Sequence, residues 1–363
     1  ILLGLVGSEM CIRDSVKKGI QWIFKDDAPL LFNPMPNLFR PYDTYSKYMW
    51  MINFFITTAL GKYKKNSENA FAISLKSRDL YFKIADEEGI EFDLMKKGII
   101  HFYNSKREFE IAASKKDWIE AMGCEWEIVD RDQIFEIEPA LKNNHKIIGG
   151  VYTKSDATGD IHKYCFELAK VLEKKYGVDF KFSETIKDIK KSNKPILQTN
   201  KSEYEFDDII LCTGVETERF RRKFGDSFRI YPVKGYSVTV DLEDDKSRES
   251  APFVSLLDDP SKLVASRLGN RLRVAGTAEL AGYNKDIRSN RIKPLLNWIN
   301  ELFPEVNTKN YLPWTGLRPM SSDMVPIIRE SKRKNVFYNS GHGHLGWTMG
   351  TYSGKLAADL VDQ

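Results

Sequence analysis

The sequence predicts an α/β (α+β) protein of about two domains, on the basis of its length and of two patterns along the chain. The chain has 363 residues, which corresponds to two domains at roughly 150 residues each. Residues 149–214 follow the order strand, helix, strands, which is typical of α/β proteins. Residues 229–284 alternate apolar and polar side chains, as in YSVTV, KLVAS and RLRVAG, and this alternation favours an antiparallel sheet.

The middle of the chain has the most regular pattern. The turn Thr158-Gly-Asp160 is suited to cap a helix, and the apolar residues after it recur with the spacing of one helical face. Gly177 is expected to end this helix, and residues 178–182 (VDFKF) to form a strand. Residues 208–212 then predict a buried strand that runs into the turn Thr213-Gly214. Elsewhere the pattern predicts helices over 71–88, 114–122, 129–141, 293–303 and 347–361, and strands over 98–103 and 335–340.

The composition excludes several classes of protein. Hydrophobic residues make up 42% and charged residues 29%, unlike a disordered, collagen-like or multi-pass membrane protein. The net charge of +4 is too small to indicate a nucleic-acid partner. The most apolar run, residues 49–60, is shorter than the roughly 20 residues that span a bilayer, so it predicts a buried or interfacial helix. The four scattered cysteines are typical of a reducing compartment.

The first fifteen residues, ILLGLVGSEMCIRDS, do not resemble a native N-terminus. They contain no initiator Met and no basic segment before the apolar stretch, which argues against a signal peptide. The string resembles translated adapter sequence, so we expect residues 1–15 to be artefactual and the genuine N-terminal segment to be missing. Residues 16–59 are rich in aromatic residues and prolines and predict short helices and turns.

The sharpest local motif is Gly341-His-Gly-His-Leu-Gly346, between a predicted strand and a predicted helix. A dinucleotide fingerprint needs an acidic residue about 20 positions further on, at the end of a second strand, and only 17 residues follow Gly346. The glycines would still let a flat ligand approach the backbone, and the helix N-terminus would attract an anion. A plain strand-to-helix turn explains the motif equally well. His342 and His344 lack a nearby cysteine or acidic cluster, so we expect no metal site.

Two weaker motifs are also candidates for ligand binding. Arg318, in WTGLRP, belongs to the residue type that best grips a carboxylate, although a lone arginine is usually a plain surface residue. The turn Thr213-Gly214 follows the carboxyl end of a buried strand, where α/β proteins bind ligands. A simple turn is the favoured interpretation of that motif taken alone.

Taken in order, TGD, CTG, YPVKGYS, RVAGTAELAGYN, WTGLRPM and GHGHLGWTM resemble the FAD-dependent D-amino acid oxidase superfamily, and most of all its bacterial D-amino acid dehydrogenases. The resemblance runs from about residue 20 to residue 361. It implies a Rossmann-like FAD-binding domain and a substrate domain with a large antiparallel sheet. The FAD-binding domain would comprise residues 150–222 and 308–363, and the substrate domain residues 60–149 and 223–307. The family's first βαβ element, which carries GxGxxG, is not found, so we expect the FAD-binding domain to be incomplete.

The resemblance also implies the site residues. Arg318 would bind the substrate carboxylate, the carbonyl of His344 would accept a hydrogen bond from the substrate amine, and Tyr236 would form part of the pocket wall. Ile186 would contact the adenosine end of FAD, and the backbone after Gly343 the pyrimidine side of the flavin. The implied cofactor-binding residues are Ile186, Thr213, Gly214, Gly316, Gly343, Leu345, Gly346, Trp347 and Thr348.

The implied activity is oxidative deamination of D-amino acids to 2-keto acids and ammonia. A hydride would pass from Cα to flavin N5, and a respiratory acceptor (a quinone or an intermediary) would take the electrons. The protein would then be cytoplasmic, with residues 50–55 resting peripherally on the inner membrane, although a place in the core explains that segment equally well. Two alternatives remain: a related flavin oxidoreductase of glycine, sarcosine, 2-hydroxy acids or glycerol phosphate, and a non-catalytic fragment that does not hold FAD.

Overall fold

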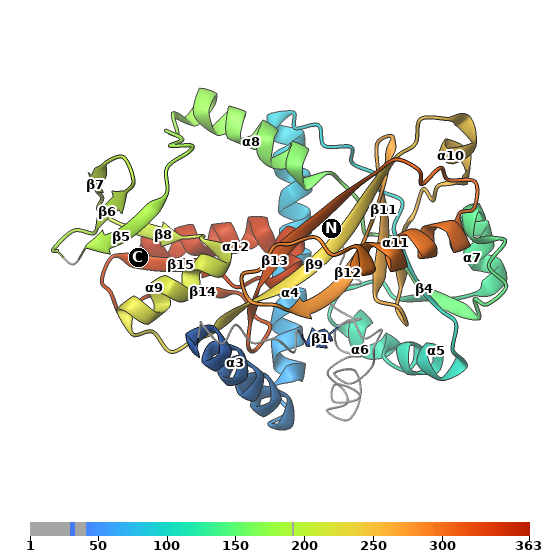
Figure 1. Ribbon diagram of the computed structural model, residues 1–363, viewed down its shortest axis with the longest axis horizontal. Coiled ribbons are helices and arrows are strands. Elements are labelled where there is room, and N and C mark those ends of the chain that lie inside the picture. The colour runs from blue at the N-terminus through green and yellow to red at the C-terminus, as the bar shows by residue number, and fades with distance from the viewer. Residues whose placement is uncertain (1–29, 33–40, 191) are drawn as a thin grey trace.

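The computed structural model describes residues 30–32, 41–190 and 192–363 (Figure 1). The expectation that residues 1–15 are artefactual concerns a segment outside the described residues. Within the described part, residues 41–59 form one long helix rather than several short ones, because only the last of the prolines in this part of the chain, Pro41, falls inside it, at its N-terminus.

A nine-stranded mixed sheet dominates the molecule, in the order β13-β9-β12-β11-β10-β2-β4-β3 with β1 beside β12. Its pairs are antiparallel except β1 with β12 and β10 with β2, which confirms the antiparallel character expected from the alternating sequence. Its strands are β1 (Leu30–Phe32), β2 (Ile99–Tyr103), β3 (Glu127–Asp130), β4 (Gly149–Thr153), β9 (Ile230–Asp241), β10 (Ser255–Asp258), β11 (Leu263–Leu268), β12 (Arg271–Leu280) and β13 (Tyr311–Ser321).

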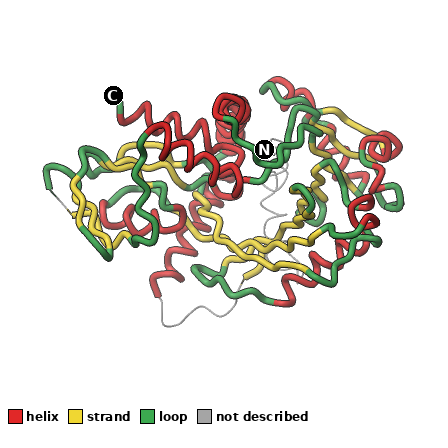
Figure 2. Tube along the Cα trace, turned by 90° about the horizontal axis from the view of Figure 1, so that it is seen from above, coloured by secondary structure: helices red, strands yellow, loops and turns green. Residues whose placement is uncertain are grey.

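The two faces of this sheet differ in what covers them. On one face Val238, Val240 and Val274 pack with Leu295 and Ile299 of α11 (Ser289–Leu302) in the main hydrophobic core. Because side chains alternate along a strand, the residues between these valines lie on the other face. Seen from above, the large sheet is a curved layer with the C-terminal helix on one side of it (Figure 2).

Two long helices pack along each other, and a third helix is attached to the large sheet. α4 (Tyr63–Glu88) packs along α12 (Gly346–Val361), and the Thr351 hydroxyl donates to the Ser77 carbonyl oxygen at 2.8 Å. α3 (Pro41–Ala59) is attached to β13 by the Trp50 indole N–H, which donates to the Met320 carbonyl at 2.8 Å. The apolar run that contains Trp50 therefore buries one of its faces.

Two small sheets complete the fold. One has the order β14-β15-β8, with β14 (Ile327–Glu330) antiparallel and β8 (Ile209–Leu211) parallel to β15 (Val336–Ser340). The other is antiparallel and consists of β5 (Ile186–Lys190), β6 (Ile196–Thr199) and β7 (Glu203–Glu205). The remaining helices are α5 (Lys106–Ala113), α6 (Lys116–Ala121), α7 (Arg131–Ile137), α8 (Ile161–Tyr176), α9 (Thr217–Phe224) and α10 (Asp245–Ser250).

The structure confirms the helix expected after Asp160 and corrects the strand expected after it. α8 begins at Ile161 and ends where Gly177 adopts a φ of +67°. Residues 178–182 form no strand, and Phe182 within them is 74% exposed. The division into two domains stays a prediction. Its boundaries cut across the large sheet, because β4 and β13 belong to that sheet although the prediction gives them to the FAD-binding domain.

Candidate functional site

Two glycine turns meet at one edge of the small parallel pair. β8 and β15 run in the same direction, so the turn Thr213-Gly214 and the loop that starts at Gly341 both leave the carboxyl edge of this pair. The Thr217 hydroxyl donates to the Ser340 hydroxyl oxygen at 2.9 Å, and the Ser340 hydroxyl in turn donates to the Gly214 carbonyl oxygen at 3.2 Å. These bonds hold the two turns side by side.

The second turn leads directly into the N-terminus of α12. The 3-10 helix Gly343–Leu345 is followed by α12 at Gly346, and in the described part of the chain no side chain caps the first turn of α12. Backbone N–H groups at a helix start are donors, and the helix dipole adds partial positive charge there. This end of α12 is therefore suited to a negatively charged or electron-rich group.

Side chains around this helix start point into the protein. Leu345 and Thr348 are buried, and the ring of Trp347 lies 4.3 Å from Tyr81 and 5.5 Å from Tyr164 between ring centroids. The side chains of these three residues are therefore occupied in packing. Only the backbone of Leu345, Trp347 and Thr348 is placed to contact a ligand.

β13 brings a charged side chain to the same region. β9 and β13 are strands of the large sheet, and their length extends to the small sheet that contains β8 and β15 (Figure 1). β13 contacts both the 3-10 helix Gly214–Glu216 and the 3-10 helix before α12. Met320 at its end forms a bridge with His342. Gly316 and Arg318, two of the predicted site residues, lie on this strand.

The Arg318 side chain is fixed by two neighbouring strands. Its guanidinium lies over Gly235 of β9, where an added Cβ would come within 2.4 Å of the guanidinium atoms. On the far side of β9, Nη1 donates to the Thr277 carbonyl oxygen at 2.7 Å. Thr277 has a φ of +64° and sits where the register of β12 shifts, between Gly276 and Glu279. This left-handed residue aims its carbonyl at the arginine, a use of backbone strain that is common at functional sites.

Comparison with known proteins identifies the family. Residues 43–360 match the family described as FAD dependent oxidoreductase. The chain belongs to this family. It is 41% identical to "D-amino acid dehydrogenase 3" of Mesorhizobium japonicum, with 96% of this chain and 82% of that protein covered. It is 34% identical to a D-amino acid dehydrogenase of Neisseria meningitidis, with 95% and 81% covered.

Solved structures agree on the fold. Glycine oxidase from Bacillus cereus superposes with a TM-score of 0.72 at 22% identity, covering 81% of this chain and 80% of that one. A glycerophosphate oxidase from Mycoplasma pneumoniae with FAD bound superposes with a TM-score of 0.70 at 17% identity, covering 83% and 81%. The expected α/β flavoenzyme fold is confirmed, and this FAD-dependent oxidoreductase uses FAD as its cofactor.

The two glycine turns of this FAD-dependent oxidoreductase fit a flat, electron-rich cofactor. A Cβ added at Gly214 would have no atom within 4 Å, so a ring can approach the backbone there. Gly343 has a φ of +61°, and an added Cβ would lie 2.6 Å from Met320 Sδ, so glycine is favoured at this close turn. Together with the uncapped start of α12, these turns could hold the cofactor.

The structure places Tyr236 on the wrong side of the sheet for the expected pocket wall. Gly235 faces the Arg318 guanidinium, so the next residue along β9 points to the opposite face. There the buried Tyr236 packs in the main core, and its hydroxyl donates to Glu279 Oε2 at 2.8 Å. Burial and the neighbouring carboxylate of Glu279 raise the pKa of Tyr236, so the hydroxyl stays protonated. We therefore withdraw Tyr236 as a pocket residue.

Ile186 lies apart from the glycine turns. It begins β5 and packs against the hydrophobic cluster that contains Leu211 of β8, while its carbonyl oxygen accepts from Arg219 Nη2 at 2.9 Å. Its expected contact with the adenosine end of FAD stays a prediction.

The histidines of the loop have structural partners. His342 Nε2 lies 2.9 Å from Ser353 Oγ, and burial lowers the pKa of His342 to about 4, so its ring is neutral at pH 7. His344 lies in the 3-10 helix before α12. Among residues 30–32, 41–190 and 192–363, no three His, Cys, Asp or Glu side chains gather in a way that could hold a metal ion.

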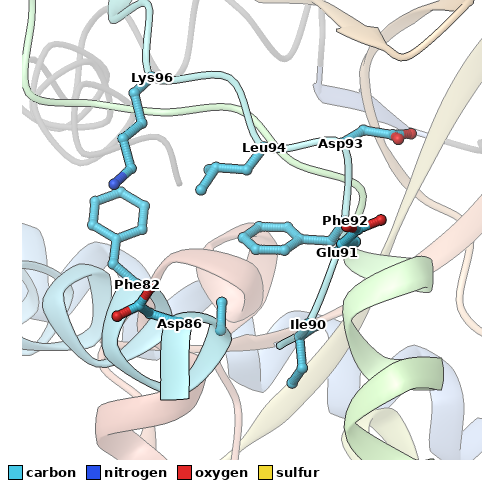
Figure 3. Close-up of a pocket in the computed structure, with 9 residues that line it drawn as sticks. Phe82, Asp86, Ile90, Glu91, Phe92, Asp93, Leu94 and Lys96 are labelled. Carbon is cyan, nitrogen blue, oxygen red and sulfur yellow. The ribbon is translucent and has the colours of Figure 1, made fainter. Parts of the chain in front are cut away.

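A pocket of about 460 Å³ lies at the C-terminal end of α4 and in the loop after it (Figure 3). None of the predicted site residues lines it, although Phe92 in its wall also packs against Trp347, with ring centroids 6.1 Å apart. It borders the aromatic cluster behind the start of α12. Its lining residues are Phe82, Ala85, Asp86, Ile90, Glu91, Phe92, Asp93, Leu94 and Lys96.

Three contributors to the site were missed by sequence reasoning. Gly235 and Thr277 hold the Arg318 guanidinium, and the Tyr283 hydroxyl donates to the Val215 carbonyl at 3.2 Å, beside the first glycine turn. Gly235 lies within the motif YPVKGYS, and Thr277 and Tyr283 lie within RVAGTAELAGYN. Their positions were therefore visible in the sequence, but their orientation depends on strand pairing.

Proposed function

We propose that this FAD-dependent oxidoreductase oxidises D-amino acids to 2-keto acids and ammonia, with Arg318 holding the substrate carboxylate. The placement of Arg318 carries the proposal: its guanidinium is fixed over Gly235 on the strand that meets both glycine turns. Relatives at 41% and 34% identity that are named D-amino acid dehydrogenases support the substrate class.

Arg318 is suited to position an amino acid. Its planar guanidinium can bind a carboxylate through two parallel hydrogen bonds, which fixes both the place and the orientation of the substrate. The bond to Thr277 holds the guanidinium before substrate arrives, so little freedom is lost on binding. The carbonyl oxygen of His344, in the loop beside β13, is proposed to accept a hydrogen bond from the substrate amine.

FAD, when bound, supplies the two-electron oxidising group of the reaction. The start of α12 favours negative charge nearby, by roughly 0.3–2 kcal/mol for a helix terminus. The tightly packed side chain of Trp347 keeps this helix start in place. The residues proposed to hold the cofactor are Ile186, Thr213, Gly214, Gly316, Gly343, Leu345, Gly346, Trp347 and Thr348.

We also propose that a respiratory acceptor reoxidises the enzyme and that α3 contacts the membrane surface peripherally. Trp50 packs inward, so this part of the apolar run is core as well as surface. None of the helices in the described ranges combines the length and the hydrophobicity that spanning a bilayer requires. Support for surface contact comes from exposed apolar side chains along α3, which are Tyr45, Tyr48, Ile52 and Ile56.

A substrate panel tests the proposed reaction. The FAD-loaded protein is assayed with an artificial electron acceptor against D- and L-amino acids, glycine, sarcosine, 2-hydroxy acids and glycerol phosphate. We expect turnover of D-amino acids, with release of ammonia, and little turnover of their L-enantiomers. Turnover of 2-hydroxy acids or glycerol phosphate alone would contradict the proposal. A chain that retains no FAD would favour the non-catalytic fragment.

A further inference from the structure

The face of the large sheet that carries Arg318 also carries a second arginine. Ser237 lies two residues after Gly235 on β9, so both face the same side. The strand register places Trp314 of β13 on one flank of Ser237 and Ala275 of β12 on the other. Arg273, two residues before Ala275, shares this face with Arg318.

Arg273 is held toward the Arg318 end of the face. Its Nη2 donates to the Ser237 hydroxyl oxygen at 3.3 Å, and its guanidinium carbon lies 5.8 Å from the centre of the Trp314 ring. Trp314 is 54% exposed and Arg273 is half-buried, so this part of the face is open to a ligand. Burial of the guanidinium lowers the pKa of Arg273 from its usual value.

Arg273 has no carboxylate in direct contact. In the described ranges no Asp or Glu oxygen lies within salt-bridge distance of it, and Asp160, the carboxylate that acts on its pKa, is paired with Arg271 on the same strand at 2.6 Å. A half-buried guanidinium without a carboxylate keeps donors free for an incoming anion, and pairing with one relieves its desolvation cost.

We propose that Arg273 binds a second carboxylate of the substrate and that the preferred substrates are the acidic D-amino acids, aspartate and glutamate. This inference rests on the proposed function. Arg318 lies over Gly235 and Arg273 reaches Ser237, two residues further along the same strand and about 7 Å away. That spacing suits the two carboxylates of one short dicarboxylic molecule. The same pair of cations repels a substrate with a basic side chain.

The test compares an acidic substrate with its neutral isostere. For wild type, R273Q and R271Q, kcat/KM is measured with D-glutamate, D-glutamine and D-alanine. We expect wild type to prefer D-glutamate over D-glutamine and R273Q to lower the ratio of the two values by about 10- to 100-fold, as for loss of a charged hydrogen bond. R271Q is the matched control, because it removes a charge from the same strand that Asp160 already balances.

A binding measurement gives a second readout that needs no turnover. Titration calorimetry with glutarate and pentanoate compares a dicarboxylate with a monocarboxylate of equal length. We expect R273Q to weaken glutarate binding by about 10- to 100-fold and pentanoate binding far less.

The outcomes separate this inference from the proposed function. D-alanine turnover without a D-glutamate preference overturns the inference and leaves the proposed function intact. An equal fall in the ratio of D-glutamate to D-glutamine kcat/KM for R271Q and R273Q also overturns it. The loss of one positive charge anywhere on this strand would then explain the change in that ratio. Without turnover of any D-amino acid the proposed function fails, and R273Q-sensitive glutarate binding still supports an anion site at Arg273.

Discussion

The orientation of Arg318 depends on a neighbour that has no side chain. Gly235 leaves the space above β9 that the guanidinium fills, and Thr277 supplies the carbonyl that holds it there. Arg318 was predicted as the carboxylate-binding residue from its motif, while these two supports were not. Their effect arises from the register of three strands, which no local sequence pattern contains.

The substitution Gly235→Ala tests this arrangement. The new Cβ would meet the guanidinium at 2.4 Å and displace it, because the backbone beneath cannot move without disturbing the sheet. We expect kcat/KM for D-alanine to fall by about 10- to 100-fold, the usual effect of misplacing a positioning group. Steady-state kinetics on the FAD-loaded protein measures it.

Gly354→Ala is the matched control for this substitution. An added Cβ there has no atom within 4 Å, and the position is exposed in α12. We expect unchanged kinetics and a gain in stability of about 0.5–1 kcal/mol, because alanine favours a helix over glycine. Unchanged kinetics in both variants would show that the position of the guanidinium is unimportant.

The position of Tyr236 differs from the one that the resemblance implied. Gly235 and Tyr236 are adjacent in a predicted strand, so they were bound to face opposite sides of the sheet. The resemblance suggested a place in the pocket wall, but the structure puts the ring in the core against α11. Which of the two faces carries Arg318 depends on the pairing of β9 with β13, which the sequence alone does not show.

At the scale of elements, α8 was predicted accurately because its signals are local. Asp160 accepts hydrogen bonds from the backbone N–H groups of His162 and Lys163, and Gly177 ends the helix in the left-handed conformation. The strand over residues 178–182 was wrong, because an alternating pattern cannot show whether a partner strand is present. The helix expected over residues 129–141 begins instead as the strand β3.

Asp160 joins two elements, and its removal should cost stability. It caps α8 and also pairs with Arg271 of β12 at 2.6 Å. We expect Asp160→Ala to lower the free energy of unfolding by about 1–2 kcal/mol and Asp160→Asn by less, since asparagine still caps a helix. Urea unfolding at pH 7 of wild type and both variants measures this, and equal stabilities of all three proteins would contradict it.

The contribution of Asp160 to the free energy of unfolding is expected to fall at low pH. Burial alone would raise the pKa of Asp160, but the N–H of Lys163, the Arg271 guanidinium and the N–H of His162 outweigh it and lower the pKa below 3.8. The stabilisation is thus fully present above pH 3.8 and is lost as the pH falls through the lower pKa of the folded state. The difference between wild type and Asp160→Ala should shrink over that range.

At the scale of the whole molecule, the sequence predicted the fold class, the large sheet and the FAD-dependent family correctly. The family prediction rests on the order of the motifs along the chain, because several short motifs in one order are far more specific than any one of them. What sequence could not supply was the common face that joins Arg318 to Arg273, since this depends on which residues of β9, β12 and β13 lie opposite one another.

Anaerobic reduction of the flavin reports directly whether the protein oxidises a D-amino acid that Arg318 holds. The FAD-loaded protein is mixed without oxygen with D-alanine or L-alanine, and the visible absorbance of oxidised flavin is followed. We predict rapid bleaching by D-alanine and little by L-alanine. Arg318→Ala should slow bleaching at subsaturating D-alanine by about 10- to 100-fold, as expected for a lost charged hydrogen bond. Equal rates in wild type and variant, or faster bleaching by L-alanine, would contradict the claim.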